Sequence, residues 1–147
     1  MRRYLILFIF IFAACKNEED RRLLEKQEDI KQFYTFQLKK SISENEIIII
    51  LQNQQCVACR RDIFSTFYNL LAKSDLHKEF IMEVPDTVII NHISHLSNSN
   101  ILFDTNHKLT NYGLDYGSDL CLYMKDGKLK KWFEISNDNL ASMHSIE

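Results

Sequence analysis

Two patterns of apolar positions lie next to each other between residues 46 and 71. Ile47 to Leu51 is an unbroken aliphatic run made mostly of β-branched residues. Such a run is typical of a strand that is buried on both faces of a sheet. The next apolar residues recur at helical spacing, at Ile63, Phe64, Phe67, Tyr68 and Leu71. They form one stripe of a helix, so the pattern predicts a strand followed directly by an amphipathic helix.

The pattern elsewhere predicts a helix before this unit and short elements after it. Arg21 to Lys40 is rich in helix-forming residues and carries a loose apolar stripe. Thr87 to Asn91 is a second β-branched run and predicts another buried strand, with residues 92–100 as a polar loop. Ile101 to Phe103 predicts a brief strand, and Asn106 to Leu114 a short helix that ends near its glycine.

The last third of the chain predicts a β-hairpin. Leu120 to Met124 and Leu129 to Ile135 have the composition of strands, and Asp126-Gly127 stands between them. Asp-Gly between two apolar runs is the strongest short signal for a hairpin turn. A β-α-β unit followed by an antiparallel hairpin indicates an α/β fold, in which helices flank a central mixed sheet and a further helix extends the N-terminus.

Length and charge limit the class of protein. The chain has 147 residues, which is enough for one domain with a hydrophobic core. Its formal net charge is −2, so it lacks the basic excess of a nucleic-acid-binding domain and no nucleic-acid partner is expected.

The cysteines carry the chemistry. Cys56 and Cys59 form a Cys-x-x-Cys motif at the junction between the predicted strand and the predicted helix. The unpaired N–H groups and the macrodipole at a helix N-terminus stabilise a thiolate and lower its pKa. The spacing therefore predicts Cys56 as the attacking thiolate and Cys59 as the resolving thiol, in the strand, Cys-x-x-Cys, helix order of thioredoxin.

Two other interpretations of the motif stay open. A zinc site would need two further Cys or His ligands, and the candidates Cys121, His92 and His95 are scattered along the chain. A structural disulfide without catalytic activity is the other alternative. Cys121 lies in an apolar run and is expected to be a small buried residue, with a third redox role as its alternative.

The N-terminus predicts export and lipidation. Arg2 and Arg3 precede an apolar stretch that ends in Ala13-Ala14, which is the organisation of a signal peptide. Cys15 follows at once, and Phe12-Ala13-Ala14-Cys15 resembles a bacterial lipobox. The resemblance implies cleavage before Cys15 and lipidation of that residue; a plain signal peptide or an uncleaved anchor is the alternative.

Two stretches resemble a known family. Gln55 to Phe64, QCVACRRDIF, resembles the Trp-Cys-x-x-Cys-Arg-x-Glu-x-Pro motif of membrane-anchored thiol-disulfide oxidoreductases of the TlpA/ResA type, which are thioredoxin-like. Ile101 to Lys130 looks like the family's strand, Tyr-Gly helix and Asp-Gly turn. The chain departs from the family in having Gln55 for the Trp and Phe64 for the Pro, and Ser118 falls near the family's cis-proline.

The resemblance implies a thioredoxin-like domain over residues 46–147, behind a signal peptide at 1–14 and a lipidated cysteine, charged spacer and helix at 15–45. That helix would pack on the domain or stand between it and the membrane. Asp62 takes the place of the family's Glu, which implies a proton relay to Cys59; an ordinary acid in the first turns of the helix is the alternative.

The predicted function is thiol-disulfide exchange in the cell envelope. The partners would be envelope protein thiols or disulfides and an upstream redox protein, and no cofactor or metal is expected. Lys16 follows the lipidated position, which favours anchoring to the outer membrane, on its periplasmic side or at the surface. A non-catalytic binding or structural lipoprotein on the same scaffold is the alternative.

Overall fold

The structure is a computed structural model that describes residues 18, 20–52 and 57–145, without the side chains of residues 57–61 and 143–145. Five strands form one sheet: β1 (Glu46–Leu51), β2 (His77–Met82), β3 (Ser99–Phe103), β4 (Leu120–Lys125) and β5 (Lys128–Glu134). The helical elements are an N-terminal helix at 20–32 that continues as the π-helix η1 (Phe33–Leu38), then α2 (Val57–Leu71), α3 (Thr87–Ser94), η2 (Lys108–Tyr112) and η3 (Leu140–Ser145).

The strands lie in the order β3-β2-β1-β4-β5. β1, β2 and β3 are parallel, whereas β4 runs antiparallel to β1 and pairs with β5 as a hairpin. A parallel β-α-β unit joined to an antiparallel hairpin on the other side of β1 is the thioredoxin-like arrangement, with β3 added outside β2. The predicted fold class is therefore confirmed.

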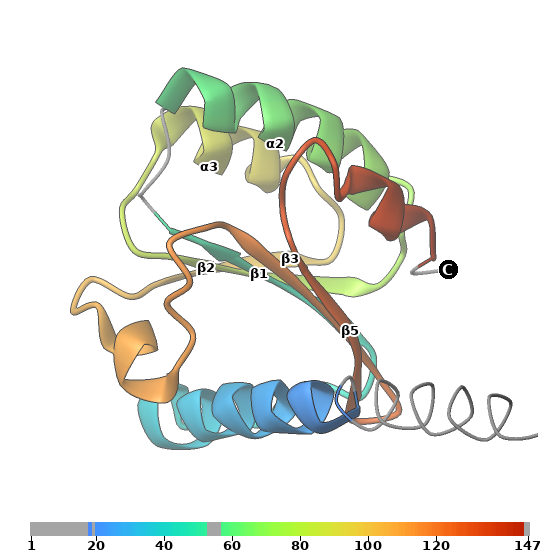
Figure 1. Ribbon diagram of the computed structural model, residues 1–147. Coiled ribbons are helices and arrows are strands. Elements are labelled where there is room, and N and C mark those ends of the chain that lie inside the picture. Colours follow the sequence, from blue (N-terminus) through green and yellow to red (C-terminus); the bar gives the residue numbers. More distant parts are fainter. Residues whose placement is uncertain (1–17, 19, 53–56, 146–147) are drawn as a thin grey trace, which may run out of the picture.

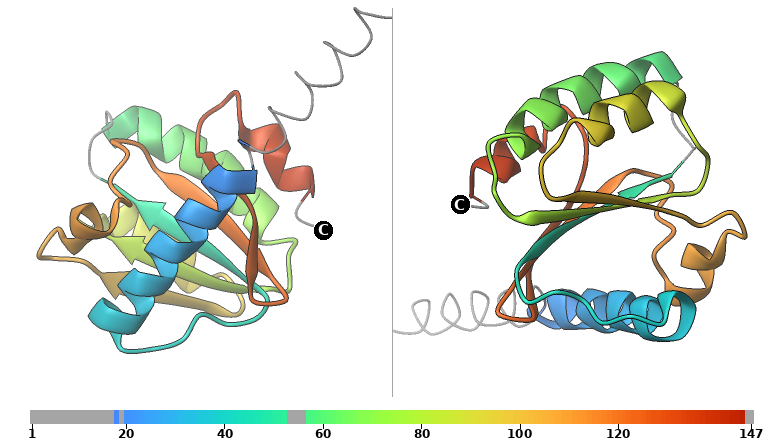
Figure 2. Two further views of the ribbon diagram at one scale, coloured as in Figure 1. Left: turned by 60° about the horizontal axis from the view of Figure 1, so that its bottom comes forward. Right: turned by 180° about the vertical axis from the view of Figure 1, so that it is seen from behind.

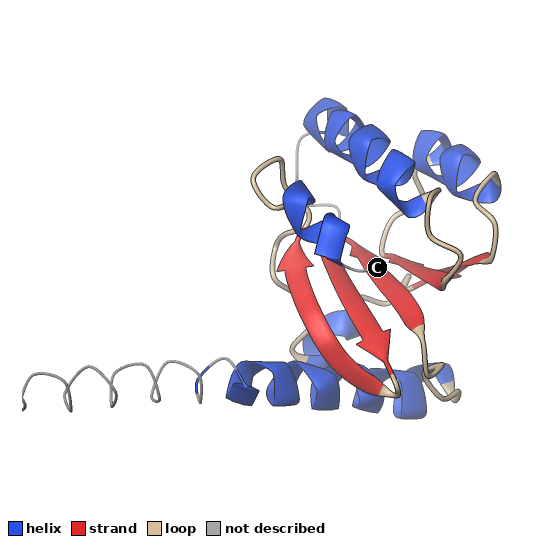
Figure 3. Ribbon diagram, turned by 90° about the vertical axis from the view of Figure 1, so that its right-hand side faces the viewer, coloured by secondary structure: helices blue, strands red, loops and turns tan. Residues whose placement is uncertain are grey.

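Helices cover both faces of the sheet (Figure 1). α2 and α3 lie over one face, with η3 beside them, and the N-terminal helix lies across the other. The same sandwich is seen from two further sides in Figure 2 and, coloured by secondary structure, in Figure 3. Every helix within the described ranges is too short or too polar to serve as a membrane span.

The central strand β1 supplies both layers of the core. Its six residues are all buried. Ile47, Ile49 and Leu51 pack among the side chains of α2 and α3, and Ile48 and Ile50 pack against Phe33 and Tyr34 of the N-terminal helix. Successive side chains of a strand point to opposite faces, so an unbroken aliphatic run fits a strand with a helix on each side. The predicted buried strand and the helix stripe that follows it are both confirmed.

The strand predicted at Thr87 to Asn91 is wrong, because these residues begin the helix α3. Asp86 is the N-cap of α3, and its carboxylate accepts hydrogen bonds from the backbone N–H groups of Val88 and Ile89. Ile89 and Ile93 then face the core, one turn apart. A cap and a buried apolar pair outweigh the weak preference of β-branched residues for strands. The loop predicted at 92–100 is accordingly replaced by the end of α3, a turn and the start of β3.

The predicted hairpin is confirmed, and its turn shows why. Asp126 and Gly127 both have positive φ, at 53° and 68°. Two central residues with positive φ are the requirement of a type I′ turn, which matches the twist of the two strands. The helical turn predicted before Gly113 is likewise present as η2, with Gly113 in the left-handed conformation at its C-terminus.

Candidate functional site

The Cys-x-x-Cys motif lies at the junction of β1 and α2. α2 begins at Val57, between the two cysteines in sequence, and its backbone includes Cys59. Cys56 and Cys15 lie outside the described residues, and the side chain of Cys59 is not described. The structure therefore bears out the strand-to-helix context of the motif, while the roles of the three cysteines stay predictions.

Asp62 lies in α2, and its side chain is exposed. It follows Cys59 by three residues, which places the two residues on the same face of the helix. An exposed carboxylate is what an ordinary acid near a helix start would show. The proton-relay role of Asp62 stays a prediction.

A buried glutamine fixes the chain where β1 ends. Gln52 is fully buried and directly precedes residues 53–56. Its Nε2 donates a hydrogen bond to the carbonyl of Leu114 (2.7 Å), and its Oε1 accepts one from the N–H of Tyr116 (3.2 Å). Its own N–H donates to Oδ1 of buried Asp119 (2.7 Å). Gln52 therefore holds the loop at 114–119 against the end of β1, beside the strand-helix junction.

This loop carries two buried hydroxyl groups. The hydroxyl oxygens of Tyr116 and Ser118 are buried, and neither has a hydrogen-bond partner among the described residues. Asp119 ends the loop, and its carbonyl accepts a hydrogen bond from the N–H of Ile135 (2.7 Å). The position that the sequence compares with the family's cis-proline thus lies in a segment tied down at both ends. The roles of Gln52 and Asp119 were not predicted from the sequence. The available signal was a polar residue directly after an aliphatic run, which can indicate a buried side chain that hydrogen-bonds to a neighbouring loop.

The residues considered as further zinc ligands, Cys121, His92 and His95, do not lie together. Cys121 is fully buried in β4, where burial raises the pKa of its thiol above the ordinary range. His92 packs its ring against Tyr68 of α2, with ring centroids 5.4 Å apart, and His95 is exposed at the C-terminus of α3. Among the side chains that the structure describes, these three do not form a metal-binding group. The prediction that Cys121 is a buried core residue is confirmed.

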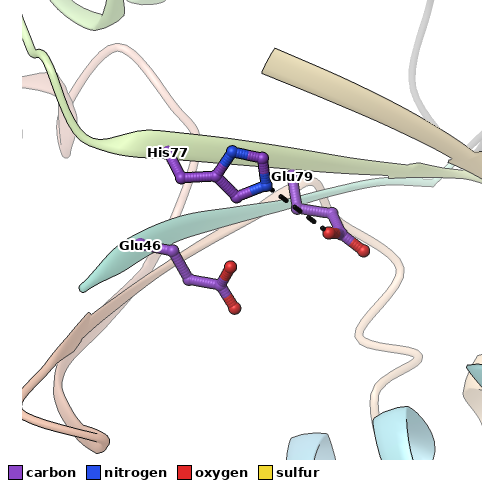
Figure 4. Close-up of side chains that lie close together, drawn as sticks. All are labelled: Glu46, His77 and Glu79. Carbon is purple, nitrogen blue, oxygen red and sulfur yellow. Dashed lines mark ion pairs between the residues drawn. The ribbon is translucent and has the colours of Figure 1, made fainter. Parts of the chain in front are cut away.

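A second polar cluster lies at the opposite end of β1 (Figure 4). Glu46 begins β1, and His77 and Glu79 lie in β2, where Glu46 pairs with His77 across the parallel ladder. Their nearest ligand atoms lie within 4.8 Å of one another. Both glutamates are about 1% exposed. Sequence reasoning missed this cluster, because the register that joins residue 46 to residue 77 is not visible in the sequence.

Two residues of the N-terminal segment complete the cluster. The Lys40 ammonium contacts both carboxylate oxygens of Glu79 and lies 5.2 Å from the ring centroid of Tyr34. Tyr34 is buried, and its hydroxyl lies beside the Glu79 carboxylate without a hydrogen bond of good geometry among the described residues. Burial, followed by the negative charges of Glu79 and Glu46, raises the pKa of Tyr34. Burial also raises the pKa of Glu46, and nearby Glu79 adds to the effect.

Comparison with known proteins gives likenesses to solved structures only. No protein-family model matches the chain, and no curated protein matches it. A solved structure from Chlorobium tepidum, provisionally described as the thiol:disulfide interchange protein DsbE, aligns with a TM-score of 0.49 at 12% identity. The alignment covers 70% of this chain and 77% of that one. A likeness of this strength carries no functional argument, so the assignment of function rests on the site itself.

Proposed function

We propose that this chain performs thiol-disulfide exchange through Cys56 and Cys59. The observation that carries the proposal is the start of α2 at Val57, directly after β1 and between the two cysteines in sequence. A helix N-terminus stabilises negative charge on sulfur through its N–H groups and macrodipole. The thioredoxin-like strand order, in which this junction follows the central strand, supports the same conclusion.

The exchange proceeds in two balanced steps. The Cys56 thiolate attacks one sulfur of a partner's disulfide, forms a mixed disulfide and releases the partner's other sulfur as a thiolate. The Cys59 thiolate then attacks the Cys56 sulfur, releases the second partner thiolate and leaves a Cys56–Cys59 disulfide. Two electrons pass to the partner, and an upstream redox protein returns the pair to its dithiol form. The reverse sequence oxidises a dithiol partner.

Asp62 would assist the second step. It follows Cys59 by three residues on the same face of α2, and its exposed carboxylate can exchange protons with water. We expect Asp62→Asn to slow resolution of the mixed disulfide and to alter its dependence on pH, while the first attack stays unchanged. Asp138→Asn, at an exposed turn outside α2, is the matched control. Equal rates in the two variants would assign Asp62 to an ordinary surface position.

The exchange would take place in the cell envelope. The charged, apolar and small-residue segments of Met1 to Ala14 and the following Cys15 support a lipid anchor. The partners would then be envelope proteins with exposed thiols or disulfides. Incorporation of labelled palmitate into the wild-type chain, and its loss in Cys15→Ser, is the expected result; label retained in Cys15→Ser would remove the anchor from the proposal.

A redox titration tests the exchange activity. The full chain carrying Cys15→Ser is equilibrated in detergent with glutathione buffers, and the Cys56–Cys59 state is read from the mass added by an alkylating reagent. A reversible two-electron transition between about −120 and −270 mV, the span of exchange proteins, is expected. Cys59→Ser is the matched control, since it should form a mixed disulfide with glutathione at Cys56 and no Cys56–Cys59 disulfide.

Other outcomes point to the alternatives. A pair that stays oxidised below about −300 mV behaves as a structural disulfide and would favour a non-catalytic binding or structural lipoprotein. A pair that never oxidises, in a protein that retains zinc, would favour a metal site at the cysteines. Either result would overturn the exchange proposal.

A further inference from the structure

We propose that Glu46, His77 and Glu79 bind a divalent transition-metal ion such as Zn²⁺, and that the Lys40 ammonium takes the place of this ion when the metal is absent. The three side chains offer one imidazole nitrogen and two carboxylates, and their nearest ligand atoms lie within 4.8 Å of one another (Figure 4). Zn²⁺ is bound by histidine and carboxylate at about 2.0–2.2 Å, commonly with three protein ligands and a water. Both glutamate side chains have several rotatable bonds, and the proposal requires them to turn so that their oxygens reach that distance.

The charges of the cluster favour a divalent ion. Two buried carboxylates face one ammonium, which contacts Glu79. Among the described residues, Ser43 gives Glu46 hydrogen bonds from its N–H (3.2 Å) and from its hydroxyl, but Glu46 has no ion pair with a lysine or arginine. Buried charge is costly unless it is paired. A divalent ion bound by both carboxylates and neutral His77 would balance two negative charges, whereas the single charge of Lys40 balances one.

Tyr34 provides an independent indication. It is 1% exposed, and its hydroxyl lies beside the Glu79 carboxylate, within reach of a hydrogen bond to it but without one of good geometry among the described residues. Buried polar groups are nearly always satisfied, and an orphan is a sign of a water or ion that belongs at the site. The water that completes a three-ligand Zn²⁺ site is a group that such a hydroxyl could bind.

The cluster is accessible, and it is separate from the cysteines. The side chains of His77 and Lys40 are 39% and 34% exposed, so an ion can enter from solvent on their side. Glu46 is the first residue of β1, whereas α2 follows the opposite end of that strand. The ligands join β1 to β2, and Lys40 belongs to the segment that follows η1. The ion would therefore stabilise the fold at this end of the sheet without entering the exchange reaction.

Calorimetric titration of Zn²⁺ tests the site in the full chain carrying Cys15→Ser, Cys56→Ser and Cys59→Ser, which removes thiolate binding at those positions. We expect one Zn²⁺ per chain. Glu46→Gln and His77→Gln should each lower the affinity by about tenfold or more. His107→Gln is the matched control, because His107 also lies beside a glutamate, with its Nδ1 3.6 Å from an oxygen of Glu83. In the part of the chain that the structure describes, that pair belongs to no three-residue group.

Lys40→Met tests the competition between the ammonium and the metal directly. It removes the competing ammonium without touching a ligand, so it should tighten Zn²⁺ binding and increase the rise in melting temperature that the metal produces. Zn²⁺ binding that is unchanged in Glu46→Gln and His77→Gln, or not tightened by Lys40→Met, would overturn the proposal, and so would the absence of binding. Lys40→Met keeps the test decisive if a ligand variant does not fold. Because Cys56 and Cys59 are replaced by serine, the result is independent of the exchange activity.

Discussion

At the scale of single residues, Cys121 differs from the Cys-x-x-Cys pair in being enclosed by the core. It lies in β4 opposite Ile49 of β1 and is fully buried. Burial raises the pKa of its thiol, and only the thiolate is strongly nucleophilic. We expect Cys121 to resist alkylation in the folded chain and to react at once after denaturation, as read by mass. Rapid labelling of Cys121 under native conditions would contradict this prediction and would reopen its third redox role.

The same pKa shift predicts a dependence of stability on pH. The folded chain keeps the Cys121 proton above about pH 8.5, where an unfolded thiol loses it. The folded state then binds more protons than the unfolded state, so the free energy of unfolding falls as pH rises through that range. Urea unfolding should show a larger loss of stability between about pH 7.5 and 9.5 in the wild type than in Cys121→Val. Equal losses in the two proteins would contradict the prediction.

Gln52 gives a second prediction at this scale. Gln52→Ala removes the side-chain hydrogen bonds to Leu114 and Tyr116 and leaves the buried carbonyl of Leu114 and the half-buried N–H of Tyr116 without these partners. We expect a loss of about 1–3 kcal/mol in the free energy of unfolding, together with a shift in the redox potential of the cysteine pair, because the loop at 114–119 lies beside the junction. Gln32→Ala is the control, since its hydrogen bond to Glu28 is exposed. A redox potential that stays unchanged would separate this network from the exchange chemistry.

At the scale of elements, α3 shows where apolar pattern alone misleads. Thr87 to Asn91 has the β-branched composition of a strand, yet the capping carboxylate of Asp86 and the buried pair Ile89 and Ile93 produce a helix. Asp86→Ala should lower the free energy of unfolding by about 1 kcal/mol, the typical value of an N-cap. Asp138→Ala is the matched control at an exposed turn. If Asp86→Ala lowers the free energy of unfolding no more than the control does, the N-cap does not stabilise α3.

The strand β2 (His77–Met82) was not predicted from the sequence, whereas elements that local chemistry decides were predictable. The aliphatic run of β1, the Asp-Gly turn between β4 and β5 and the glycine that ends η2 each leave a signal within a few residues. The polar groups that surround the sites leave no such local signal in the sequence. Gln52 meets Leu114, and Glu46 meets His77 and Glu79, only because the sheet places them together. Pairing register is set by the whole fold, so these contacts could not be read from one stretch of sequence.

At the scale of the whole molecule, the N-terminal helix is a layer of the fold. It covers the face of the sheet opposite α2 and α3, and Ile30, Phe33 and Tyr34 are buried against that face (Figure 1). Of the two arrangements predicted for this helix, packing on the domain is therefore the one observed. Figure 1 also shows the start of this helix and the start of α2 at opposite corners of the molecule.

Because the N-terminal helix packs on the sheet, we expect its buried and exposed phenylalanines to contribute differently to stability. Phe33 is fully buried and Phe36 is 68% exposed, although both lie in η1. Phe33→Ala should lower the free energy of unfolding by about 3–5 kcal/mol, whereas Phe36→Ala should change it little. The only tryptophan, Trp132, lies in β5 and packs against the core cluster that includes Phe33, so its fluorescence in a urea titration reports on unfolding of the sheet at this layer. If the helix folded apart from the domain, the Trp132 transition would be the same in both variants; a shift in Phe33→Ala alone shows that helix and sheet unfold as one unit.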